Sequence, residues 1–330
     1  MKKILCAGLI TAILCTWSTM LWAGAWSMNQ GGVYAKYSVN HYYTNYTFTE
    51  GGGIERLPSG TTFTDNNTTL YLEYGITNRL TISGSVPYKW LRSTYNRQVT
   101  VSGQTKTQHV ETHWNGFGDM ELGLKYCFLT EPVVSSVQFL YKNAWLYNSN
   151  ERIPPGNHQD DYELRLLFGK SLWPFPGYCG AEFGYRWRSQ APSDEYHYLF
   201  EFGVNATEKL SFRLKLDGTK SVQNADLPPS PKPIVTAYID EETGRVIKKT
   251  ITPEQQLSGA NPSLGLQYDL GKLEFTTSYQ IAKRWFCELS YTNYPYGTNI
   301  SPGDQYSFAL VYYFDNKKSA PSPLEIDDTD

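Results

Sequence analysis

The charged side chains of this sequence fall at every second position of short apolar segments. Glu163 and Arg165 alternate with leucines, while Arg186 and Arg188 alternate with aromatic residues. A period of two places all these charges on one face of a β-strand. If that face lines the inside of a barrel, the charges can orient a polar solute in a constriction, or they can fill the interior as cross-strand ion pairs. The near balance of acidic and basic residues in these rows favours ion pairs.

The inward rows of the expected strands provide the candidates for such an interior. A positive patch without acidic partners is most expected where Arg186 and Arg188 lie near Arg213 and Lys215 on a nearby strand. The pore-lining candidates are Lys36, Glu73, Lys125, Glu163, Arg165, Glu182, Arg186, Arg188, Glu201, Arg213 and Lys215.

Three histidines, His41, His109 and His113, are candidates for catalysis or metal binding. His41 lies on the outward row of its strand, but no serine nucleophile stands out beside it, so an aromatic role at the membrane interface is expected. His109 and His113 flank Glu111 in a loop, where this spacing has no helix to bring two metal ligands together. We therefore expect no enzyme, no metal and no cofactor.

Composition narrows the class of protein. The 330 residues carry a net charge of −3, with 18% charged and 15% aromatic residues, including 26 tyrosines. A disordered chain would be richer in charge and poorer in aromatic residues. The mean hydropathy is −0.45, and past the N-terminus no apolar run approaches the roughly 18 to 20 residues of a spanning helix. Nothing suggests a basic face for a nucleic-acid partner.

The N-terminus has the pattern of a secretory signal peptide over residues 1–25. Lys2 and Lys3 precede an apolar run from Ile4 to Leu14, and Ala23-Gly24-Ala25 offers small residues at a cleavage site before Trp26. The less favoured alternative is an uncleaved anchor helix. Residues 26–314 then form the main domain, and the acidic, proline-containing residues 315–330 are expected to be a disordered periplasmic tail.

The main domain alternates apolar and polar residues in about 12 segments, an even number as in bacterial outer-membrane barrels. Residues 33–43 give a run long enough for a tilted spanning strand. Short turns such as 77–79 and 207–209 alternate with long connections, of which 93–114 and 220–262 are the longest and each carry a projecting hairpin. We predict an all-β fold: a transmembrane, antiparallel up-and-down β-barrel of the outer-membrane type.

Tryptophans lie at the ends of the expected strands, which favours this barrel over a soluble β-sandwich. Trp173 and Trp285 are at short-turn ends, and Trp90, Trp145 and Trp187 are near long-loop ends. Two girdles of this kind place amphipathic rings at the headgroup levels of a membrane.

The last strand ends in alternating aromatic residues, with Tyr312 and Phe314 at its close, and resembles the C-terminal signature by which outer-membrane barrels are recognised for insertion. The 16-residue tail beyond Phe314 departs from that pattern, which usually ends at the aromatic residue. More narrowly, residues 72–80, 116–126 and 184–188 resemble the outer-membrane transporter barrels of the phenol-degradation meta-pathway type and their relatives near surface-polysaccharide clusters. The resemblance spans nearly the whole mature chain and implies transport.

Three functions remain open on the sequence. The first, which we favour, is a channel or transporter for small molecules, with hydrophobic or aromatic solutes among the candidates, in the outer membrane of a Gram-negative bacterium. The second is a surface or envelope-assembly barrel whose loops bind a partner or exopolysaccharide, and the third, least favoured, is a lipid-active enzyme. The expected partners are outer-membrane lipid and lipopolysaccharide, the barrel-assembly machinery and a small-molecule solute, with the barrel itself a monomer.

Overall fold

A computed structural model describes the part of the chain in which the sequence predicted the barrel. Most of the expected signal peptide, 1–25, and most of the expected tail, 315–330, lie outside the described residues. Within the described part, no helix is long and apolar enough to cross a membrane. The described residues are 24–101, 104–148, 153, 155–156, 159–189, 192–225, 234–239, 246–251 and 267–316.

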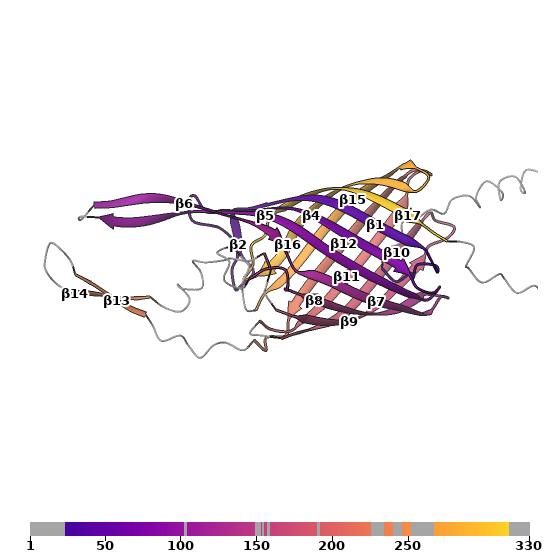
Figure 1. Cartoon of the computed structure of the whole chain (residues 1–330), viewed down its shortest axis with the longest axis horizontal. Helices are drawn as coiled ribbons and strands as arrows, with labels where there is room; N and C mark the ends of the chain where they lie inside the picture. Colours follow the sequence, from indigo (N-terminus) through magenta and orange to yellow (C-terminus); the bar gives the residue numbers. More distant parts are fainter. Residues whose placement is uncertain are drawn as a thin grey trace, which may run out of the picture.

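The described chain is built of antiparallel β-strands (Figure 1). Their bounds are β1 (Val33–Thr44), β2 (Tyr46–Phe48), β3 (Ile54–Arg56), β4 (Thr62–Gly75), β5 (Leu80–Val101), β6 (Gln104–Phe117), β7 (Met120–Leu129), β8 (Val134–Asn143), β9 (Asp161–Ser171), β10 (Gly177–Arg188), β11 (Glu195–Asn205), β12 (Leu210–Ser221), β13 (Ile234–Ile239), β14 (Val246–Ile251), β15 (Asp269–Ala282), β16 (Trp285–Thr298) and β17 (Asp304–Phe314).

One sheet closes on itself to make the barrel. Its order is β4-β1-β17-β16-β15-β12-β11-β10-β9-β8-β7-β5, and a further pairing of β4 with β5 completes the ring. The first and last strands lie side by side, with Val33 opposite Phe314. The prediction of a closed antiparallel barrel of 12 strands is confirmed.

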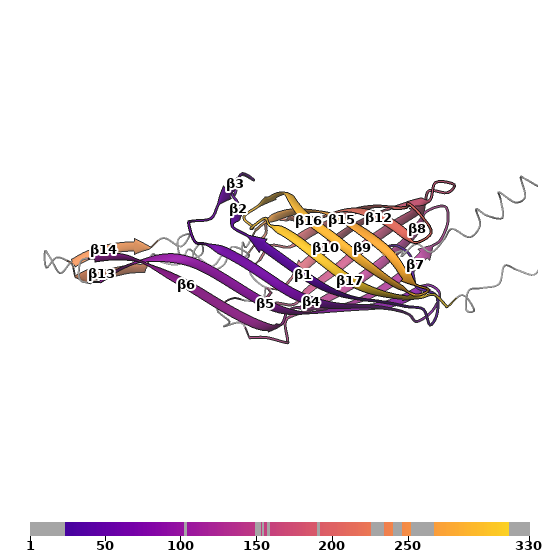
Figure 2. The same ribbon diagram turned by 90° about the horizontal axis from the view of Figure 1, so that it is seen from above.

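The alternation in the sequence becomes two faces of this wall. On β9, Leu164 and Leu166 face outward with 45% and 46% of their surface exposed, whereas Glu163 faces inward and is 2% exposed. Apolar residues therefore cover the outside, as a lipid-facing surface requires, and polar residues fill the inside. Strands tilt across the barrel in both views (Figure 2).

In two of the tight turns a threonine hydroxyl accepts hydrogen bonds from the backbone of the turn. Thr77 Oγ1 accepts hydrogen bonds from the backbone N–H groups of Arg79 and Leu80, at 3.2 and 3.0 Å. Thr207 Oγ1 does the same with Lys209 and Leu210, at 3.3 and 3.0 Å. A threonine hydroxyl that bonds to the backbone in this way favours a turn over continued strand.

The segment 93–114, expected as a long loop with a hairpin, is almost entirely strand. It is the outer part of β5 and β6, which pair from Tyr88 opposite Phe117 to Val101 opposite Gln104 and run beyond the barrel as a two-stranded ribbon (Figure 1). Pro87 has no N–H to donate, but its carbonyl accepts from Gly118 N at 3.0 Å where β6 gives way to β7. In 220–262, β13 pairs with β14, and residues 226–233, 240–245 and 252–262 are outside the described part.

Candidate functional site: the lumen of the barrel

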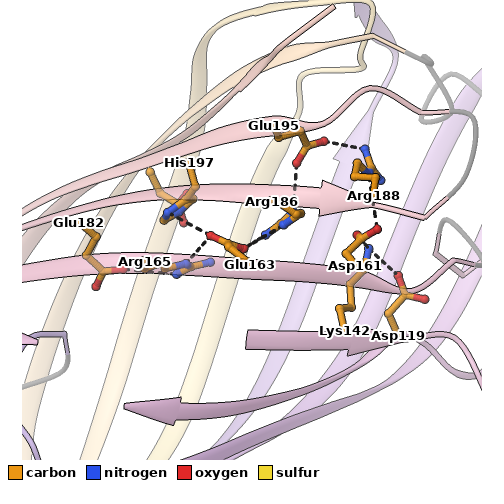
Figure 3. A network of polar contacts seen from close by, with 11 residues as sticks. Asp119, Lys142, Asp161, Glu163, Arg165, Glu182, Arg186, Arg188, Glu195 and His197 are labelled. Atoms are coloured by element: carbon orange, nitrogen blue, oxygen red, sulfur yellow. Dashed lines mark hydrogen bonds and ion pairs between the residues drawn. The ribbon is translucent and has the colours of Figure 1, made fainter. Parts of the chain in front are cut away.

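The polar inner rows meet in the lumen, where two clusters of ion pairs form. The first is shown in Figure 3 and centres on Glu163 of β9. Glu163 Oε1 lies 2.5 Å from Arg165 Nε, and Glu163 Oε2 lies 2.8 Å from Arg186 Nη2 of β10. Arg165 also reaches Glu182, with 3.3 Å between Nη1 and Oε2. The side chain of Glu163 is thus shared by two guanidinium groups from neighbouring strands.

The same cluster continues toward the ends of the strands that face the long connections. Arg186 and Arg188 both bind Glu195, with Nη1 to carboxylate distances of 3.1 and 2.6 Å. Arg188 Nε also lies 3.6 Å from Asp161 Oδ1, and Lys142 Nζ lies 2.5 Å from Asp161 Oδ2. Sequence reasoning missed Glu195, although it stands in phase with the inward residue Glu201 on the same strand.

The second cluster joins the first strand to the last strands of the chain. Lys36 Nζ of β1 lies 2.6 Å from Glu288 Oε2 of β16. Arg213 of β12 lies between three carboxylates, at 3.8 Å from Glu201, 3.6 Å from Glu274 and 3.8 Å from Glu288. Lys215 Nζ lies 3.3 Å from Glu274 Oε1. Glu201 accepts a further hydrogen bond from the hydroxyl of Tyr178.

The expectation of an unpaired positive patch was wrong. Arg186, Arg188, Arg213 and Lys215 each have at least one carboxylate within 4.0 Å. The register of the sheet decides which side chains are neighbours on adjacent strands. Here it places an acidic residue next to each of these cations. The inner rows form cross-strand ion pairs rather than an unpaired positive patch.

Near the short-turn end, the lumen holds Lys125 of β7 and Glu73 of β4. Lys125 Nζ lies 3.4 Å from Glu73 Oε2 and 2.8 Å from the carbonyl oxygen of Gly24, to which it donates. The inside of the barrel contains cavities of about 200 and 250 Å³ that are both lined by Gly24. The stretch before β1 therefore occupies part of the lumen, which sequence reasoning did not foresee.

The histidines considered for catalysis or metal binding lie apart from the lumen clusters. His41 Nδ1 is 2.6 Å from Asn66 Oδ1 on the outer face. His113 Nε2 is 2.9 Å from Glu111 Oε1, and Arg92 Nε is 2.5 Å from the same oxygen. These residues lie on strands of the ribbon rather than in a loop, and His109 instead contacts Asn96 at 2.9 Å. The described residues contain no group of three or more side chains that could hold a metal ion.

The tryptophans expected at the membrane interfaces are all exposed. Four of them lie at or next to strand ends, whereas Trp90 lies within β5 opposite Asn66, because β5 continues past this position into the ribbon. The exposed fractions run from 41% to 71%. Trp285 packs against Tyr312, with ring centroids 5.0 Å apart, and Arg284 lies over the ring of Phe314 at 4.4 Å from its centroid. The closing residues of the expected insertion signature are therefore part of an aromatic belt at the short-turn end. The five tryptophans are Trp90, Trp145, Trp173, Trp187 and Trp285.

Comparisons with known proteins place the fold. No family model matches the chain, and no curated protein does either. The chain is similar to the COG4313 outer membrane channel from Pseudomonas putida F1, with 12% identity and a TM-score of 0.59 over 88% of this chain and 98% of that chain. This likeness shows that the chain shares the fold of an outer-membrane β-barrel.

Two further solved structures are similar at lower scores. The NanC porin has 9% identity and a TM-score of 0.47 over 84% of this chain and 99% of that chain. The KdgM porin has 8% identity and a TM-score of 0.44 over 84% of this chain and 99% of that chain.

Proposed function

We propose that the protein is a passive channel of the Gram-negative outer membrane that admits small molecules carrying polar groups. The observation that carries the proposal is a closed wall of strands, apolar outside, whose charged inner face encloses cavities of about 200 and 250 Å³. A barrel of about 8 strands is filled by its own side chains, whereas one of 16 to 18 leaves a wide channel. A ring of intermediate size with polar filling suits a narrow pathway.

The pairing of the lumen charges indicates how a solute would pass. A charged group that enters meets cations already held by carboxylates, so it must exchange for an existing partner rather than enter a field of one sign. Such a lumen has weak preference for either sign of charge. Tyr34, Tyr71 and Trp26 line the smaller cavity beside Lys36 and Glu182. Solutes that combine an aromatic ring with a polar group therefore suit this site.

Conductance across planar bilayers tests the proposal. Purified protein should give discrete conductance steps in potassium chloride, and proteoliposomes should swell faster in glycine or benzoate than in a disaccharide, because the cavities are small. Protein that inserts as a heat-modifiable barrel but shows no conductance and no swelling would contradict the channel.

The ribbon of β5 and β6 favours a second candidate, a surface barrel that binds a partner or a polysaccharide. Beyond Thr94, the last residue of β5 that pairs with β4, the two strands of the ribbon pair with each other, and Asn96 Nδ2 donates to Ser59 O at 3.0 Å. Deletion of residues 96–109 separates the candidates. A channel keeps its conductance after this deletion, whereas a surface-binding barrel loses retention of whole cells on immobilised exopolysaccharide.

A further inference from the structure

The stretch before β1 crosses the lumen instead of leaving the barrel. At the start of β1, Gly31 N donates to Gly75 O of β4 at 2.8 Å. Ser27 Oγ donates to Asn78 O at 2.8 Å, and Met28 N donates to Thr81 Oγ1 at 2.9 Å. The side chain of Met28 is 5% exposed and packs with Tyr34, Phe286 and Val311 of β1, β16 and β17. Residues 26–28, which we call the strap, are thus fixed at one side of the lumen.

The indole ring of Trp26 reaches the opposite wall of the barrel. Its ring meets Tyr178 of β10 edge-on, with centroids 5.7 Å apart. It also packs on Gly169 of β9, where a Cβ atom would come within 2.5 Å of Trp26 Cη2. In the ring of strands, β9 and β10 lie across the barrel from β1. The absence of a side chain at position 169 therefore provides the space that the indole ring occupies.

The residue before Trp26 continues in the lumen. Ala25 is 2% exposed, and its carbonyl oxygen accepts a hydrogen bond from Ser136 Oγ of β8. Trp26 lines the smaller cavity together with Lys36, Glu182 and Arg213. The indole ring of the strap thus borders the smaller cavity, and Gly24 just before the strap lines both cavities.

We propose that Trp26 is the residue that sets the size limit of the pore, because its ring extends from the strap across the lumen to the wall at Gly169 and Tyr178. This inference rests on the channel function proposed above. It assigns the selectivity of the channel to a residue outside the strands, held by packing rather than by the ion pairs of the wall.

Removal of a signal peptide after Ala25 is compatible with this role. The contacts of Trp26, Ser27 and Met28 with Tyr178, Asn78 and Thr81 do not involve Gly24 or Ala25. The new α-ammonium group of Trp26 would take the place of the Ala25 peptide beside Ser136. Glu182 Oε1 lies 3.5 Å from the position of a Cβ on Gly24, so an acidic side chain is already present near the new positive charge.

The first arm of the test measures single-channel conductance in planar bilayers. Trp26→Ala should raise the conductance by about twofold or more, because it removes the bulkiest obstacle in a narrow pore. Trp173→Ala is the matched control, since Trp173 is 63% exposed at a turn between β9 and β10, and it should leave the conductance unchanged. Equal, open conductances for wild type and Trp26→Ala would overturn the role of Trp26 and leave the channel standing. Two silent proteins would overturn the channel and the role of Trp26 together.

The second arm locates the strap without relying on conductance. In a chain with Cys127→Ser, Cys179→Ser and Cys287→Ser, the pair Trp26→Cys and Tyr178→Cys should be joined by a short bis-maleimide in isolated outer membranes. The control pair combines Trp26→Cys with Ser307→Cys, which lies near the N-terminal end of β17. This pair should not be joined. Failure of the first pair to react, while each single cysteine is labelled after denaturation, would overturn the placement of Trp26.

Discussion

Arg188 Nη1 lies 2.6 Å from Glu195 Oε1, and both side chains are almost completely buried, at 1% and 2% exposure. The two residues begin and end the connection between β10 and β11, so this ion pair ties the loop ends together inside the barrel. A buried pair of this kind is costly to break, since removal of one partner leaves an uncompensated charge in the interior.

Glu195→Gln should therefore destabilise the barrel strongly. We expect a loss of about 3 to 5 kcal/mol, since Arg186 and Arg188 both lose a charged partner. The temperature at which the folded band converts to the unfolded band in detergent gels measures the effect. The matched control is Glu111→Gln, which breaks the exposed pair with Arg92 and should leave the conversion temperature close to that of the wild type. Equal conversion temperatures for the two variants would show that the buried cluster does not stabilise the fold.

Arg213→Gln should make the channel prefer cations. Arg213 is flanked by Glu201, Glu274 and Glu288 within 3.8 Å. After its removal, Glu288 keeps Lys36 and Glu274 keeps Lys215, so the three carboxylates share two cations among the described residues. The reversal potential in a potassium chloride gradient reports the change. Lys170→Gln removes one positive charge from the exposed outer row of β9 and provides the control. An unshifted reversal potential for Arg213→Gln would place the ion path elsewhere.

Leu166→Arg should impair insertion, because the side chain lies in the middle of the outward row of β9 with 46% of its surface exposed. An arginine at the midplane of a bilayer costs about 2 to 4 kcal/mol in such barrels. The yield of folded protein in outer-membrane fractions measures the loss. Gln108→Arg adds the same charge to an exposed position of the ribbon and should insert normally. A normal yield of Leu166→Arg would argue against a lipid-facing outer surface.

Phe314→Ala should slow assembly more than an equal change within the same strand. The residue closes the row that resembles an insertion signature, and it also lies under Arg284. Phe308→Ala removes the same ring from the middle of β17, where it is 48% exposed. Pulse-chase appearance of the folded band should be delayed for Phe314→Ala and close to wild type for Phe308→Ala. Equal delays would mean that lost apolar surface, rather than the terminal position, limits assembly.

Much of the barrel wall could be predicted from the sequence, because the alternation of apolar and polar residues within each strand shows which face is apolar. Leu164 and Leu166 alternate with Glu163 and Arg165, and this local pattern is enough to assign the outside and the inside. The pairing of individual charges could not be predicted in the same way. Whether Arg188 meets Glu195 depends on the register between strands, which no single segment contains.

The role of Trp26 was hidden for a different reason. The sequence places it at the expected start of the mature chain, where an aromatic residue has no strand pattern to interpret. Its position depends on Gly169 and Tyr178, more than a hundred residues away, and on the direction in which the chain turns before β1. A glycine within β9 was the available signal, since a strand glycine often marks the close approach of another group.

The pairing of Val33 with Phe314 has a consequence for the time at which this protein can fold. The seam of the barrel joins the beginning of the domain to its end, so no hydrogen-bonded ring exists until β17 has been synthesised and exported. Before that moment β1 and the most recent strand both present open edges, which readily pair with other chains. The polypeptide must therefore be kept unfolded during its passage, and a chain that stops before β17 has no closed state to reach.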